Sequence, residues 1–176
     1  MPPEQRDSVD SIVEKAVVSY PFIDPDVEAA VDRIAKLHRY LEHLWERTAQ
    51  GFDLNRGGYK VLLCLVQAQD RTATPGVLSR RCMISTGAMT NRIDRLEARG
   101  FVERVRDDKD RRSVKVRITG KGVEVLEAAL VVQAQAEIEA LSVLDAEDKA
   151  QLNELLGKLM RRFEAEGDLP AELLEH

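Results

Sequence analysis

Small polar side chains at helical spacing are the first candidates for chemistry in this sequence. A helix running from Ser85 to Gly100 would place Met89, Ile93 and Leu96 on one face, at about 100° per residue. Its opposite face would carry small, hydrogen-bonding residues, as a helix needs if it is to reach base edges in the major groove of DNA. We therefore expect groove and phosphate contacts from Ser85, Thr86, Thr90, Asn91 and Arg95.

A strongly charged segment after this helix has the pattern of a β-hairpin tip. Residues 101–106 and 113–119 alternate with a period of two, and their apolar members are Phe101, Val114, Val116 and Ile118. The run DDKDRR between the two strands is too polar to bury. We expect this wing to reach the DNA backbone or the minor groove through Lys109, Arg111 and Arg112.

The distribution of charge favours a DNA partner, although the total charge of −5 does not. Thr74 to Lys121 contains thirteen basic and six acidic residues, a balance of +7 that leaves −12 for the remainder. Positive charge is therefore concentrated where phosphate neutralisation would need it. The alternative for each arginine is a solvated side chain or an ion pair, with Asp94 and Asp110 as partners for Arg104 or Arg112.

The elements that must hold this segment are helices with clear start signals. Thr74 precedes Pro75 and predicts a helix to about Arg81, because proline suits the first turn. Asn55 predicts a helix to about Gln69, in which the pair Gly57-Gly58 indicates close backbone approach, with fraying as the alternative. Thr119 predicts a helix over 121–141 and Asp145 one over 146–166.

Apolar stripes on the outer helices favour a two-fold dimer. Residues 8–19 predict a short amphipathic helix that covers either its own subunit or a partner. Asp24 or Asp26 would start a helix over 27–49 with a buried seam, and Leu152 to Phe163 form a second stripe. Gly157 inside the helix over 146–166 suggests a tight helix contact, because Gly costs about 1 kcal/mol relative to Ala. One small lobe cannot cover both stripes.

The order of these features is that of a known family. The residues concerned are STGAMTNRIDRLEARGFVERVRDDKDRRSVKVRIT, above all DRLEARG and the D-x-DRR wing. The chain resembles the MarR family of bacterial transcriptional regulators over roughly Val31 to Phe163. The resemblance implies a mainly α fold with a minor β part: a winged helix-turn-helix lobe with a two-stranded wing, flanked by N- and C-terminal dimerisation helices. It also implies a homodimer that binds double-stranded DNA.

These features predict the following organisation. Residues 1–26 are an N-terminal extension with the short helix, 27–54 and 120–166 the helical dimerisation region, and 55–119 the DNA-binding lobe. Residues 167–176 are a tail whose last residues, Leu174 to His176, resemble a vector-derived tag, so His176 receives no function.

The resemblance further implies a cleft for small phenolic or other anionic aromatic effectors. We expect His38, Trp45 and Arg92 to line it, with a core or interface position as the alternative for His38 and Trp45. Such an effector would fix a lobe spacing that does not match the DNA groove, which predicts a ligand-responsive repressor of a pseudo-palindromic operator. A urate effector is disfavoured, because residues 8–19 lack Trp and Lys60 replaces the Asp of the urate-responsive branch.

Other classes of function have weaker signals. The sequence has no phosphate-binding loop or nucleophile elbow, and His38 and His43 lack a third ligand, so we expect no enzyme, metal or cofactor. Two alternatives stay open: a thiol-based redox sensor acting through Cys82, although its apolar neighbours favour a buried role, and a winged-helix protein-interaction adaptor without DNA binding. The sequence lacks an apolar run of about 20 residues and a signal peptide, so we expect no membrane association and a cytoplasmic location.

Overall fold

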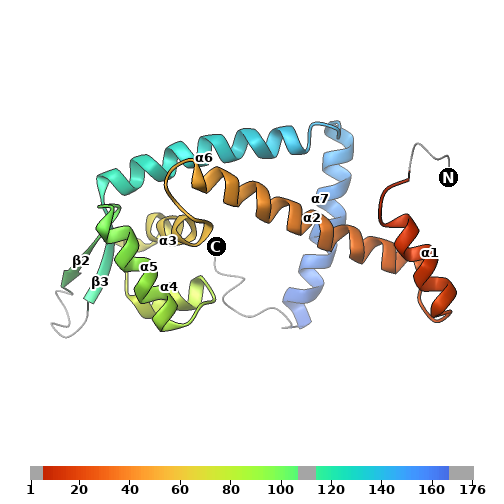
Figure 1. Ribbon diagram of the computed structural model, residues 1–176, viewed down its shortest axis with the longest axis horizontal. Coiled ribbons are helices and arrows are strands. Elements are labelled where there is room, and N and C mark those ends of the chain that lie inside the picture. Colours follow the sequence, from red (N-terminus) through yellow and green to blue (C-terminus); the bar gives the residue numbers. More distant parts are fainter. Residues whose placement is uncertain (1–5, 107–113, 167–176) are drawn as a thin grey trace. The chain divides into compact units, whose positions relative to one another are not determined.

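The computed structural model, drawn in Figure 1, describes residues 6–106 and 114–166. The chain forms two compact units, Met1–Trp45 and Glu46–His176. The first unit contains helix α1 (Asp10–Ser19) and most of α2 (Pro25–Gln50), which ends in the second unit. None of the helices in the described part of the chain is long and apolar enough to cross a membrane.

Helix α1 lies against α2 of its own chain. Arg33 of α2 donates hydrogen bonds to the carboxylates of Asp7 and Asp10, both at 2.8 Å, and Lys36 Nζ donates to Ser8 Oγ at 2.9 Å. The hydrogen bond from Arg33 holds the pKa of Asp7 below its usual value. Within its own chain, α1 therefore covers part of α2, and a contact with a partner subunit stays a prediction.

Helix α2 leaves most of its predicted seam uncovered in the single chain. Val27, Val31 and Ile34 are 59%, 57% and 45% exposed. Only Thr48 and Ala49 of this helix are buried. A periodic apolar stripe shows that a helix has a face to cover, without showing which surface covers it.

The second unit contains the remaining elements. Their order is α3 (Arg56–Gln67), η2 (Gln69–Arg71), β1 (Thr72–Ala73), α4 (Pro75–Arg81), α5 (Thr86–Ala98), β2 (Val102–Arg106), β3 (Val114–Ile118), α6 (Gly120–Ala140) and α7 (Ala146–Glu166). The strands form an antiparallel sheet in the order β1-β3-β2. The two-residue strand β1 was not predicted, because it is too short to show a period. The winged helix-turn-helix architecture itself is confirmed.

The predicted helix starts are confirmed by their capping hydrogen bonds. Asn55 Oδ1 accepts from the Gly58 amide at 2.7 Å, and Thr119 Oγ1 accepts from the Gly122 amide at 3.0 Å. Asp145 and Asp148 cap α7 reciprocally. Each side chain satisfies an amide that has no partner within its helix, which is why these residue types predict starts reliably. Thr74, Ser85 and Asp24 act in the same way.

The core of the second unit joins α3, α4, α5, the sheet and the start of α6. Its most buried large side chains include Leu62, Leu65, Leu78, Met89, Ile93 and Leu126. Of the predicted apolar strand residues, Val116 and Ile118 are buried, but Val114 is 44% exposed. Val114 shares their face of β3 at the end farthest from Ile118, where the core no longer reaches. Phe101 is buried but precedes β2, whose buried member is Val102.

The tight helix contact expected at Gly157 of α7 stays a prediction. Among the described residues, a Cβ at this position would meet only Arg161 of the same helix within 4 Å, so no second helix of the described chain packs against it. The apolar side chains from Leu152 to Phe163 are each at least 37% exposed. The stripe therefore remains without a cover in the described chain.

Gly122 is required where α6 begins, and its replacement provides a test of the fold. We expect Gly122→Ala to lower the free energy of unfolding by about 1–3 kcal/mol, because the new Cβ would overlap the Phe101 carbonyl and lie 2.8 Å from Ile118 Cγ1. Gly120→Ala is the matched control in the same helical turn, since a Cβ there meets nothing within 4 Å. Urea unfolding measures both variants, and equal stabilities would contradict the packing described here.

Candidate nucleic-acid interface

The inner face of α5 is anchored in the core while its outer face is open. Met89 and Ile93 are 0% exposed and Leu96 is 3% exposed. The predicted contact residues Ser85, Thr86, Thr90, Asn91 and Arg95 are all exposed, so the helical wheel separated the two faces correctly. Thr90 Oγ1 donates to the Thr86 carbonyl at 3.0 Å. The side chain of Asn91 makes no hydrogen bond with any described residue, which leaves its amide for a ligand.

The wing is described as far as its strands. Val102 pairs with Ile118 and Arg106 with Val114 in the β2–β3 ladder. The predicted contact residues Lys109, Arg111 and Arg112 lie outside the described residues. Arg106, which was not among the predicted contact residues, ends β2 with an exposed side chain.

Arg104 on β2 forms the ion pair that was considered as its alternative. Its guanidinium lies 2.5 Å from Asp94 Oδ1 and also pairs with Glu97, the two carboxylates coming from one face of α5. The hydrogen bond to Asp94 is the main cause of a raised pKa for Arg104. Asp94 was predicted as a partner, whereas Glu97 was not.

The end of α5 is joined directly to α6. Gly100 adopts a left-handed φ of 72°, which closes the helix as predicted. Lys121 Nζ donates to the Arg99 carbonyl at 2.8 Å, and Thr119 Oγ1 donates to the Gly100 carbonyl at 2.7 Å. The start of α6 therefore satisfies carbonyl groups that the end of α5 leaves open.

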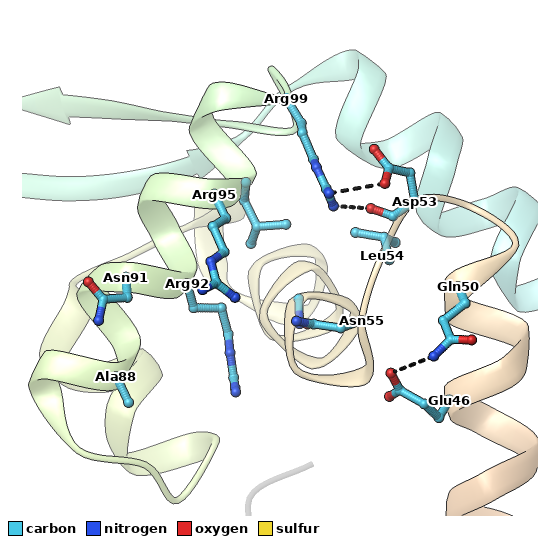
Figure 2. A pocket seen from close by; sticks show the side chains of 12 residues that line it. Glu46, Gln50, Asp53, Leu54, Asn55, Ala88, Asn91, Arg92, Arg95 and Arg99 are labelled. Carbon is cyan, nitrogen blue, oxygen red and sulfur yellow. Dashed lines mark hydrogen bonds and ion pairs between the residues drawn. The ribbon is translucent and has the colours of Figure 1, made fainter.

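A pocket of about 480 Å³ lies beside α5, entirely within the second unit. Figure 2 shows side chains from α5 and from the α2–α3 connection that line it. Arg99 is paired with Asp53 at 3.0 Å and also bonds to its carbonyl (Figure 2). Arg92 and Arg95 make no ion pair with the residues that the structure describes. The complete lining is Glu46, Gln50, Asp53, Leu54, Asn55, Gly58, Ala88, Asn91, Arg92, Arg95, Leu96 and Arg99.

Glycines in the first turn of α3 make room for α5 side chains. A Cβ at Gly57 would overlap the guanidinium of Arg92, with Arg92 Nε only 2.6 Å away. A Cβ at Gly58 would lie 3.2 Å from Leu96 Cδ2. The close approach predicted from Gly57-Gly58 is therefore confirmed, and the approaching groups are side chains of α5. Arg92 lies half-buried across the bare backbone of a helix start.

The pocket is electrostatically suited to an anion. The acidic side chains that line it are engaged: Glu46 accepts from the Arg56 amide at 3.0 Å, and Asp53 pairs with Arg99. Two unpaired guanidinium groups then face the N-terminus of α3, where the helix dipole also favours negative charge. The sequence did not predict that Arg95 lines this pocket, because helical periodicity only places it beside the outer face of α5.

The other residues predicted for an effector site lie in the first unit. His38 is exposed and Trp45 is half-buried. Their part in effector binding stays a prediction.

Cys64 and Cys82 form a thiol pair that the sequence did not reveal. Both are buried, at 7% and 9% exposure, and neither is in a disulfide. The hydrogen bond from Cys82 lowers the pKa of Cys64 to about 7, and the same bond together with burial raises the pKa of Cys82. Their separation along the chain carries no periodic signal. No group of three or more His, Cys, Asp or Glu residues in the described ranges could hold a metal ion.

Comparisons with known proteins agree on one family. The MarR family model matches residues 54–114. The multiple antibiotic resistance protein MarR of Escherichia coli (strain K12) is 31% identical over 109 residues, 61% of this chain and 74% of that protein. The transcriptional repressor MprA of the same strain is 32% identical over 116 residues, 66% of this chain and 65% of that protein.

A solved structure agrees with the fold. Sco3205, a MarR family transcriptional regulator from Streptomyces coelicolor crystallised in complex with DNA, superposes with a TM-score of 0.68 at 23% identity. The match covers 86% of this chain and 92% of that one.

The thiol pair can be tested by titration. In Cys82→Ala we expect the pKa of Cys64 to rise from about 7 toward its ordinary value of 9.0, because the thiol that stabilises the Cys64 thiolate is lost. Thiolate absorbance against pH in the folded protein measures this, and Cys64→Ala removes the signal near pH 7 as a control. An unchanged titration in Cys82→Ala would show that the two thiols do not interact.

Proposed function

This chain belongs to the MarR family of transcriptional regulators, and we propose that it is a homodimeric, DNA-binding repressor released from its operator by a small anionic effector. The observation that carries the DNA part is the exposed polar face of α5, held by a buried apolar face in a segment of charge +7. Phosphate neutralisation by that segment supplies affinity, and base-edge contacts supply sequence preference. MprA, named a transcriptional repressor, supports repression.

The proposed binding mode places each α5 in a major groove. Thr90 and Asn91 read base edges, with Ser85, Thr86 and Arg95 at groove or phosphate positions. The wing residues Lys109, Arg111 and Arg112 reach the backbone or the minor groove. Two copies related by a two-fold axis would read half-sites about one helical turn, roughly 34–36 Å, apart. A pseudo-palindromic operator follows from that symmetry.

Exposed apolar stripes support the dimer. Leu155 and Leu159 of α7 are 52% and 44% exposed, and Val131 and Ile138 of α6 are 70% and 63% exposed. A second copy that covers these faces would remove apolar surface from water, which is the main driving force of stable homodimers.

The effector would act through the pocket beside α5. Arg92 and Arg95 offer two unpaired cations. A part for His38 and Trp45, which lie in the first unit, stays a prediction. An anion bound there selects a position of α5 that no longer matches the groove spacing. A hundredfold release requires only about 2.7 kcal/mol of differential affinity between the two states. A small aromatic carboxylate has the charge and size that the pocket requires.

The alternative functions have less support from the structure. Burial of Cys82 favours a packing role, since reactive thiols are partly exposed. An adaptor without DNA binding would have little use for the exposed polar face of α5.

The decisive experiment follows binding of the protein to DNA that flanks its own coding region, at several salt concentrations and against random duplex. Tight, sequence-preferring binding by a dimer, falling steeply with salt, supports the regulator. Equal binding to random duplex at every salt concentration would favour the adaptor instead.

Asn91→Ala should lose sequence preference. We expect it to lose about 1–3 kcal/mol on the operator and little on random duplex, because a base-edge contact is removed. Arg111→Ala is the contrast: it should weaken both complexes equally and reduce the salt slope by about 1. Equal losses on both DNAs for Asn91→Ala would show that the groove-reading residues have been placed wrongly.

Arg92→Gln tests the effector site. We expect aromatic carboxylates to lower operator affinity in the native protein, and the half-effective concentration to rise at least tenfold in the variant, because a guanidinium facing the bound anion is lost. Lys158→Gln removes one charge from α7, outside the pocket lining, and should leave the response unchanged. An unaltered response in Arg92→Gln would remove this pocket from the mechanism.

A further inference from the structure

One cation joins the middle of the wing strand β2 to α5. Arg104 lies in the middle of β2, opposite Val116 of β3. Its guanidinium binds Asp94 and Glu97, and its backbone amide donates to Glu97 Oε1 at 3.0 Å. Both the side chain and the main chain of one strand residue are thus attached to α5.

This clasp, defined as Arg104 with Asp94 and Glu97, connects elements that the core holds unequally. Helix α5 is fixed by three side chains at most 3% exposed. Strand β2 buries only Val102, its first residue, and the strand beyond it is half-buried or exposed. The clasp attaches at Arg104, two residues beyond Val102 on the strand and opposite the buried Val116 of β3.

The two carboxylates of the clasp should weaken binding to DNA if only their charge is considered. Asp94 is on the outer face of α5, with its side chain 54% exposed, close to where phosphates would approach. Negative charge there opposes binding to a polyanion. If charge alone mattered, Asn and Gln at these two positions would serve better.

We propose that Arg104 is a positioning residue for DNA binding: through Asp94 and Glu97 it sets the angle of the wing against α5, so that both reach one duplex together. Its guanidinium is used by the two carboxylates and makes no phosphate contact of its own. The basic side chains of the hairpin, including the exposed Arg106, depend on it for their reach. This proposal rests on the proposed DNA-binding function.

The double variant Asp94→Asn with Glu97→Gln separates positioning from simple electrostatics, because the two predict opposite signs. Loss of two negative charges at the interface would strengthen binding if charge alone decided it. If the clasp positions the wing, binding should weaken at least tenfold on operator and on random duplex. The salt slope should also fall by about 1 or more, although no basic residue has been removed.

Two further variants complete the experiment. Glu103→Gln removes one acidic charge from the neighbouring residue of β2, where Glu103 pairs with Arg117 within the sheet at 3.5 Å. It should bind DNA as well as the native protein or better. Arg104→Lys keeps the charge but cannot bridge two carboxylates in the same way, so it should recover only part of the affinity that Arg104→Gln loses.

The outcomes distinguish this proposal from the proposed function. Circular dichroism and thermal midpoints confirm that each variant is folded. If the native protein prefers its operator but the double variant binds as tightly with an unchanged salt slope, Arg104 has no positioning role and the regulator stands. If the native protein itself shows no preference for the operator, the proposed function fails first.

Discussion

Burial of one face of α5 is the constraint on which the rest of the second unit depends. Met89, Ile93 and Leu96 enter the core completely, so the helix cannot rotate without exposing them. If the helix rotated about its axis, Thr90 and Asn91 would no longer lie on its solvent-exposed face. The polar surface of the helix is therefore oriented by side chains that themselves touch no ligand.

The ends of α5 are held by polar contacts rather than by burial. Ser85 caps its start, and the carbonyls of Arg99 and Gly100 accept hydrogen bonds from Lys121 and Thr119. These bonds join the helix to the first turn of α6. A change in the position of α6 would thus be transmitted to α5, and the pocket beside Arg92 lies where a ligand could influence the same helix.

The arginines around α5 differ in whether they have an acidic partner. Arg104 is used by two carboxylates and Arg99 by Asp53, whereas Arg92 and Arg95 have no acidic partner in the described residues. A balance of +7 over one segment therefore overstates the charge that is open to phosphates, and the ion pairs decide which cations serve the wing, the pocket and the groove.

What the sequence determined by itself was local. Helix starts at Asn55, Ser85 and Thr119, the left-handed end at Gly100 and the two faces of α5 all follow from neighbouring residues, because capping and helical periodicity act over a few positions. Tertiary structure alone decided the rest. Three contacts join residues from different elements: Cys64 with Cys82, Arg92 with the backbone at Gly57, and Arg104 with its second carboxylate. The exposure of Val114 likewise depends on how far the core extends along β3. Such features depend on how the elements pack together, and neither helical periodicity nor a capping residue carries information about packing between distant segments.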